Sequence, residues 1–243
     1  GKLKDVINSL LAYVYQEAGV LLAWSGVLFL LLWLIRQPGV LVTMPAPQTV
    51  YTYNPKVGVH TRLTDEVEAW KIQRSLAMVR VMGAPWIVEY FPWPYLEPEP
   101  GNYDWGHSDM VIAHARNQGF TVIARLGMVP GWARPDPKIQ ETTFTHLDRE
   151  HYADFAAYAA TFVQHYAGQI QHIIIWNEPN LSFEWGYRLV DPAAYTDLLA
   201  AAYPAAHHAN PDVVVLGGAL APTLEPAGSS AGLSDLIYLT EMY

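Results

Sequence analysis

The stretch Ile173–Asn180 reads IIIWNEPN, three isoleucines that lead directly into an Asn-Glu-Pro sequence. An apolar run of β-branched residues predicts a strand that is buried on both faces, as strands of parallel sheets are. Glu178 follows at the carboxyl end of this strand. In a (β/α)8 barrel, the residues that perform chemistry gather at the carboxyl ends of the strands. The stretch therefore predicts a buried parallel strand that delivers a glutamate to the catalytic rim of a barrel.

Short apolar segments alternate with helical segments on both sides of this stretch. Such alternation predicts parallel strands joined by right-handed crossovers, in either a doubly wound sheet or a barrel. The predicted strands are 57–60, 86–93, 121–128, 171–176 and 213–219. The predicted helices are 64–82, 107–118, 148–167 and 192–209, with another beginning at 233–243.

The position of the polar residues favours the barrel over the doubly wound sheet. No glycine-rich turn follows the first predicted strand, which argues against a dinucleotide site. His60, Glu89, Arg125, Asn177 and Glu178 all fall at or near carboxyl strand ends. We therefore expect an α/β fold in which residues 56–243 form about five units of an eight-unit barrel.

Glu178 and Asn177 are the residues expected to carry chemistry. Partial burial of Glu178 beside Trp176 would raise its pKa and keep it protonated for a leaving group. Asn177 would donate a hydrogen bond to a sugar hydroxyl beside the scissile bond. The alternative is that Glu178 only caps the following helix or pairs with an arginine.

Two motifs resemble clan A glycoside hydrolases, the superfamily of β-xylosidases, cellulases and β-galactosidases. The first is WNEPNLSFEW at 176–185, which is most similar to the β-xylosidase and α-L-iduronidase branch; the second is FPWPYLEPEPGNYDW at 91–105. The resemblance implies retaining hydrolysis of β-glycosidic bonds in an oligo- or polysaccharide, without a cofactor. It also implies that Glu178 is the acid/base and Asn177 the neighbouring sugar-binding amide.

Five further residues are candidates for lining sugar subsites, because aromatic faces stack on the C–H faces of pyranose rings. Each is equally compatible with a packing role. They are His60, Trp93, Arg125, Trp132 and Trp185.

The nucleophile of a retaining glycosidase is a second carboxylate about 5–5.5 Å from the first. The resemblance implies that it follows a seventh strand, and we count five predicted strands. Glu89 and Glu184 lie near the rim, but neither occupies that position. Two functions therefore stay open: a membrane-anchored glycosidase, or a non-catalytic accessory subunit of a larger membrane complex with a degenerate hydrolase domain.

The N-terminal segment 1–36 contains eighteen uncharged residues at 18–35, AGVLLAWSGVLFLLLWLI. At about 1.5 Å per residue, such a helix nearly spans a hydrocarbon core of roughly 30 Å. We expect a single-pass helix in the lipid bilayer, with the domain on the extracytoplasmic side. A signal peptide is the alternative. Residues 37–55, rich in Pro and Thr, are predicted to be an extended tether.

Composition excludes several classes of function. A net charge of −9 without any basic stripe argues against nucleic acid as a partner. Cysteine is absent, which excludes disulfides, thiolate metal sites and cysteine nucleophiles. The nine histidines are scattered, and no metal site or cofactor site is predicted.

Overall fold

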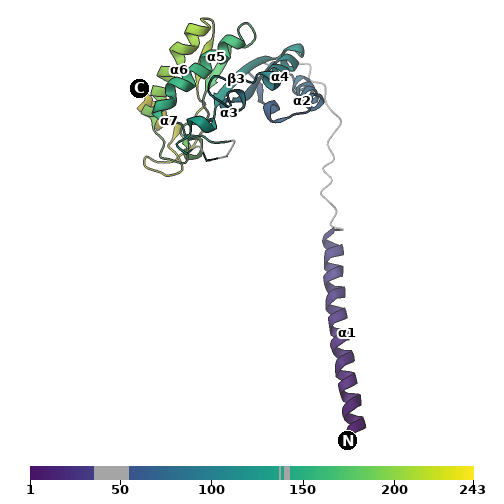
Figure 1. Ribbon diagram of the computed structural model, residues 1–243. Helices are drawn as coiled ribbons and strands as arrows, with labels where there is room; N and C mark the ends of the chain where they lie inside the picture. Colours follow the sequence, from purple (N-terminus) through teal and green to yellow (C-terminus); the bar gives the residue numbers. More distant parts are fainter. Residues whose placement is uncertain (36–54, 137, 140–142) are drawn as a thin grey trace. The chain divides into compact units, whose positions relative to one another are not determined.

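The computed structural model describes residues 1–35, 55–136, 138–139 and 143–243 (Figure 1). The chain divides into two compact units, Gly1–Gln48 and Thr49–Tyr243. The predicted tether at 37–55 lies outside the described residues, apart from its last residue.

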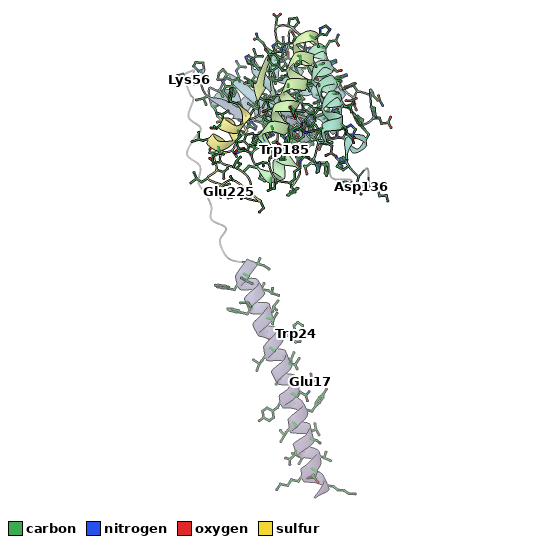
Figure 2. The ribbon with its side chains drawn as sticks, turned by 90° about the vertical axis from the view of Figure 1, so that its left-hand side faces the viewer. Glu17, Trp24, Lys56, Asp136, Trp185 and Glu225 are labelled. Carbon is green, nitrogen blue, oxygen red and sulfur yellow. The ribbon has the colours of Figure 1, made fainter. Side chains whose placement is uncertain are left out.

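The N-terminal unit contains one unbroken helix, α1 (Lys2–Ile35), drawn in purple in Figure 1. It begins well before residue 18, because the preceding residues offer no helix breaker and Gly1 accepts the first backbone hydrogen bonds at 3.1 and 3.3 Å. All its side chains are exposed, including Glu17 and Trp24, which project outward in Figure 2. The helix is long and apolar enough to cross a membrane, and a signal sequence has the same properties.

The second unit is built on a five-stranded parallel sheet in the order β1-β2-β3-β4-β5. All five predicted strands are confirmed, each within a few residues of its expected ends. The strands are β1 (Gly58–His60), β2 (Trp86–Pro92), β3 (Thr121–Gly127), β4 (His172–Ile175) and β5 (Val214–Gly217).

Helices follow each strand, as the alternating pattern predicts. They are α2 (Ala69–Val81), α3 (Trp93–Leu96), α4 (Gly106–Asn117), α5 (Tyr152–His165), α6 (Pro192–Ala209) and α7 (Asp235–Met242). Short 3-10 turns are η1 (Leu63–Asp65), η2 (Gly131–Ala133), η3 (Arg149–His151) and η4 (Ser182–Trp185). α5 and α6 pack side by side, as the two green helices in Figure 1 show.

Helix α6 has the bounds that its boundary residues predict. Asp191 precedes it, and its carboxylate accepts a hydrogen bond from the Ala194 N–H at 2.8 Å. Pro192 takes the first helical position, where its missing N–H has no intrahelical partner to lose.

The predicted helix 64–82 is wrong at its start, because α2 begins only at Ala69. The residues just before α2 bind to Glu89 on β2 instead of forming helix. Its carboxylate accepts hydrogen bonds from the Leu63 N–H at 3.0 Å and from the Thr64 N–H at 3.1 Å. The Thr64 hydroxyl donates to the Tyr90 carbonyl at 2.6 Å. A fully buried carboxylate needs several donors, and this need outweighs the local preference for helix.

The two faces of β3 differ in burial. On β3, Val122, Ala124 and Leu126 are buried in the core shared with α2, α4, α5 and α6. Ile123 and Arg125 alternate with them and are only half-buried on the opposite, helix-free face. The candidate site therefore lies where that face meets the carboxyl ends of the strands.

Candidate active site

The backbone at the end of β4 turns sharply to present the Asn-Glu-Pro sequence. Trp176 and Glu178 have positive φ angles of 71° and 37°, a region that non-glycine residues rarely adopt. Hydrogen bonds from neighbouring strands hold them there: Trp176 N–H donates to the Leu126 carbonyl at 2.8 Å, and Glu178 N–H donates to the Ala219 carbonyl at 3.0 Å. Such strain clusters at functional sites, where the surrounding structure enforces it.

Tyr195 on α6 fastens the ends of β4 and β5 together from beneath the turn. Its hydroxyl donates to the Ile175 carbonyl at 2.8 Å and accepts a hydrogen bond from the Gly218 N–H. Burial of this phenol also raises its pKa, so it remains a neutral donor. The strand end that carries Glu178 is thus anchored by a buried side chain.

Asn177 is the centre of a hydrogen-bond chain. Its Oδ1 accepts from Arg125 Nη1 at 2.7 Å, and its Nδ2 donates to Glu184 Oε1 at 2.8 Å. Arg125 comes from β3, and Glu184 comes from η4 beyond the Asn-Glu-Pro sequence. Three elements therefore converge on one amide.

The charged groups of the site influence one another electrostatically. Burial raises the pKa of Glu184, opposed by the Asn177 hydrogen bond and the Arg125 charge, and the negative charge of Glu178 raises it further. Arg125 in turn feels the charges of Glu184 and Glu178. Glu178 is half-buried, and its charge acts on both Glu184 and Arg125.

His60 joins this region from the end of β1. Its side chain is exposed, and partial desolvation together with the Arg125 charge lowers its pKa. Tyr90 lies beneath the arginine, with the guanidinium carbon 4.5 Å from its ring centroid. Of the residues expected at the strand ends, Arg125 and Asn177 are hydrogen-bonded to each other, and the Arg125 charge acts on His60.

Two of the aromatic candidates are core residues, which corrects their prediction as sugar-subsite residues. Trp93 is fully buried: its ring stacks on Tyr158 at 5.6 Å between centroids, and its indole N–H donates to Glu97 at 2.6 Å. Trp185 is 1% exposed and packs between Trp176 and Tyr195. Neither ring has a face open to a ligand.

Trp132 on η2 is partly buried, and its indole N–H donates to the Glu97 carbonyl at 3.1 Å. Its ring meets Trp93 edge-on at 5.2 Å between centroids. It is the one predicted tryptophan whose ring keeps some exposure.

A cavity lies at the other end of the strands. It holds about 560 Å³ and is lined by residues such as Phe120, Thr121, Ile170 and Gln171, just before β3 and β4 begin. None of the predicted site residues lines it. In the part of the chain that the structure describes, no group of three His, Asp or Glu residues could hold a metal ion.

Tyr90 and Glu184 are the site residues that sequence reasoning left aside. Tyr90 is the register partner of Arg125 on the neighbouring strand, so their side chains share a face. The alternation of side chains along the two paired strands therefore could have predicted that Tyr90 lies beside Arg125. Glu184 contacts Asn177 because the η4 turn brings it back toward the end of β4. The local sequence pattern does not predict this turn.

Comparison with known proteins relates part of the second unit to glycoside hydrolases. Residues 63–135 match a family model described as beta-galactosidase, glycoside hydrolase family 42. The domain has a clan A glycoside hydrolase-like fold. The family match covers β2 and β3 and ends before Glu178.

Solved structures align with most of the second unit. A family 39 glycoside hydrolase from Bacteroides cellulosilyticus WH2 is 25% identical, with a TM-score of 0.52 over 66% of this chain and 31% of that one. A monomeric beta-xylosidase from Caulobacter crescentus CB15 is 20% identical, with a TM-score of 0.52 over 66% and 35%. A GH5_18 protein from Streptomyces cattleya, in complex with GlcNAc, is 15% identical, with a TM-score of 0.53 over 68% and 44%.

The chain thus spans less than half the length of each of these structures. No curated protein sequence matches it. The similarity therefore supports a glycoside hydrolase-like fold for the domain.

Proposed function

We propose that the glycoside hydrolase-like domain binds a β-linked oligo- or polysaccharide at the carboxyl ends of β3 and β4, with Glu178 as the proton donor. The observation that carries this proposal is the strained turn at Glu178, next to an amide that is held at both ends. A half-buried carboxyl group beside a fixed amide suits protonation of a leaving group next to a bound sugar hydroxyl.

In retaining hydrolysis, Glu178 would protonate the glycosidic oxygen while a second carboxylate attacks the anomeric carbon. Glu178 would then remove a proton from the water that releases the sugar. The clan resemblance implies that the second carboxylate follows a seventh strand, and the described residues contain five. Hydrolysis is therefore proposed for a protein that supplies this carboxylate.

The test compares leaving groups of different acidity. The natural protein, including whatever segment supplies the second carboxylate, is assayed in mild detergent with 4-nitrophenyl and 2,4-dinitrophenyl β-glycosides of galactose, xylose and mannose. Glu178→Ala should lower kcat/KM for the poorer leaving group about 10²- to 10⁴-fold. The loss should be much smaller for the dinitrophenyl sugar, which departs without protonation.

Asp212→Asn is the control, because Asp212 is exposed and lies just before β5 begins, at the opposite end of the strands from the site. It should match wild type on all substrates. An equal loss on both leaving groups in Glu178→Ala would contradict the acid/base role.

The second candidate is a non-catalytic accessory subunit. The observation that favours it is the exposed apolar face of β5, where Val214 and Leu216 are 39% and 37% exposed. Apolar side chains on an uncovered sheet face favour contact with another polypeptide. Binding of glycosides without turnover by a protein that also supplies the second carboxylate would support this function over hydrolysis.

We further propose that α1 anchors the protein in a membrane, with the domain on the extracytoplasmic side. The support is its length, about 51 Å, and its lack of charge from residue 18 to 35. Flotation with liposomes should require residues 1–35, and protease protection in intact cells should locate the domain. Recovery of a mature chain lacking α1 would instead identify a signal sequence.

A further inference from the structure

Glu184 makes one of the two hydrogen bonds that hold the Asn177 amide. Its carboxylate accepts from Asn177 Nδ2 at 2.8 Å, while Arg125 Nη1 donates to Asn177 Oδ1 at 2.7 Å. A guanidinium can only donate and an ionised carboxylate can only accept. The two partners therefore determine which way the amide faces.

The amide retains unused capacity on both atoms. Nδ2 carries two hydrogens and Oδ1 has two lone pairs, and each atom has one partner among the described residues. Asn177 is half-buried, and its second Nδ2–H has no partner among the described residues.

We propose that Glu184 is a positioning residue: with Arg125, it locks the Asn177 amide so that its second N–H faces a sugar hydroxyl beside the scissile bond. This inference rests on the proposed function. Glu184 itself contacts Asn177 rather than the reacting atoms.

Glu184 is held firmly enough to perform this role. The Trp176 indole N–H donates to the Glu184 carbonyl at 2.7 Å, and the Glu184 N–H donates to the Leu181 carbonyl at 3.2 Å. On either side of it, the Thr145 hydroxyl donates to the Phe183 carbonyl at 2.6 Å and accepts from the Gly186 N–H at 3.2 Å. The turn that carries Glu184 is thus tied to β4 and to the loop before α5.

A purely structural link would not need a carboxylate here. Burial and the nearby Glu178 charge both disfavour the ionised form of Glu184. A glutamine would accept the same hydrogen bond without that cost. An ionised acceptor binds an N–H more strongly than a neutral one, which favours a role in fixing the amide.

The first experiment follows the Asn177 amide without any sugar. In ¹⁵N NMR spectra of the full chain in detergent, the variant Asn177→Asp identifies the two Nδ2–H signals by their loss. These signals should move with pH in wild type, as Glu184 titrates beside Glu178 and Arg125. Glu184→Ala should shift both signals and speed their exchange with water, and Glu184→Gln should remove most of the pH dependence. Unchanged Asn177 signals in Glu184→Ala would overturn the positioning role.

The second experiment tests whether the lock acts on a sugar. The probes are methyl β-D-galactopyranoside, methyl β-D-xylopyranoside and their 2-deoxy analogues, titrated by NMR. Wild type should bind the 2-hydroxy sugar about fivefold more tightly, which is the worth of one hydrogen bond. Glu184→Ala should lose this preference while its Kd for the 2-deoxy sugar stays within twofold. Glu184→Gln should retain most of the preference.

The outcomes separate the two proposals. Equal weakening of both sugars in Glu184→Ala would show a structural role and overturn the inference. If wild type binds no sugar, the proposed function fails, while the amide signals still decide whether Glu184 positions Asn177. The control Asp212→Asn removes a carboxylate from an exposed position at the opposite end of the strands and should leave both measurements unchanged.

Discussion

Asn180 and Ala221 form a reciprocal pair of hydrogen bonds. Asn180 Nδ2 donates to the Ala221 carbonyl at 2.9 Å, and the Ala221 N–H donates to Asn180 Oδ1 at 2.8 Å. Asn180 Nδ2 also donates to the Leu233 carbonyl at 3.0 Å. Asn180 is fully buried, so the second asparagine of the WNEPN sequence fastens the loops after β4 and β5 together.

Removal of this amide should destabilise the second unit strongly. Asn180→Ala leaves three buried backbone groups without their partner, at about 1–3 kcal/mol each. We expect a loss of at least about 3 kcal/mol in the free energy of unfolding, measured by urea denaturation monitored by tryptophan fluorescence. The control Asn117→Ala, at an exposed position, should stay within about 0.5 kcal/mol of wild type.

The Tyr195 hydroxyl should contribute measurably to stability. Tyr195→Phe removes the donor to the Ile175 carbonyl and the acceptor of the Gly218 N–H. We expect a loss of about 1–3 kcal/mol in unfolding free energy by the same method. The control Tyr203→Phe alters a half-exposed tyrosine on the same helix. A loss as large in Tyr203→Phe would contradict the specific contribution of the bridge.

The turn after η4 should tolerate only glycine. Gly186 has φ +77°, and a Cβ there would lie 2.6 Å from His146 Cβ. Gly101 has a similar φ, +74°, with open space around it. Gly101→Ala should therefore cost about 1–2 kcal/mol for the left-handed backbone alone. Gly186→Ala should cost about 1–3 kcal/mol more, because of the overlap, and equal losses would contradict this account.

Stability should depend on pH through Glu184. Its folded pKa is raised, chiefly by burial, so the folded state binds the proton more tightly than the unfolded state. Its contribution is fully present below the ordinary glutamate pKa and is lost as pH rises through the raised value. As pH rises from acidic to neutral, wild type should therefore lose unfolding free energy that Glu184→Gln does not lose. The difference in stability between the two proteins should shift in favour of Glu184→Gln over this range. Parallel stability curves for the two proteins, measured from pH 4 to 8, would contradict the raised pKa.

Most of the fold could be predicted from local sequence. The strands and helix α6 follow from apolar runs, from the Asp191-Pro192 start and from the strict alternation of elements. Parallel strands bring their carboxyl ends to one edge, so His60, Arg125, Asn177 and Glu178 could be assigned to one rim.

The exceptions depend on contacts between distant residues. The start of α2 moved to Ala69 because the Glu89 carboxylate, more than twenty residues away, captures Leu63 and Thr64. Trp93 and Trp185 follow strands 2 and 4, yet both rings turn into the core. Aromatic residues near a rim can serve packing or binding, and only their neighbours distinguish the two.

The amino-acid pattern alone determines the alternating architecture and the delivery of Glu178 to a strand end, because periodicity and β-branching act within one segment. Only the folded structure determines how the Asn177 amide is oriented and that it contacts Glu184. It also determines that Asn177 lies in the site while Asn180 fastens the buried loops. Each requires hydrogen bonds between residues brought together by three separate elements. Hydrogen bonds require distances near 3 Å, and the packed sheet and its loops set those distances.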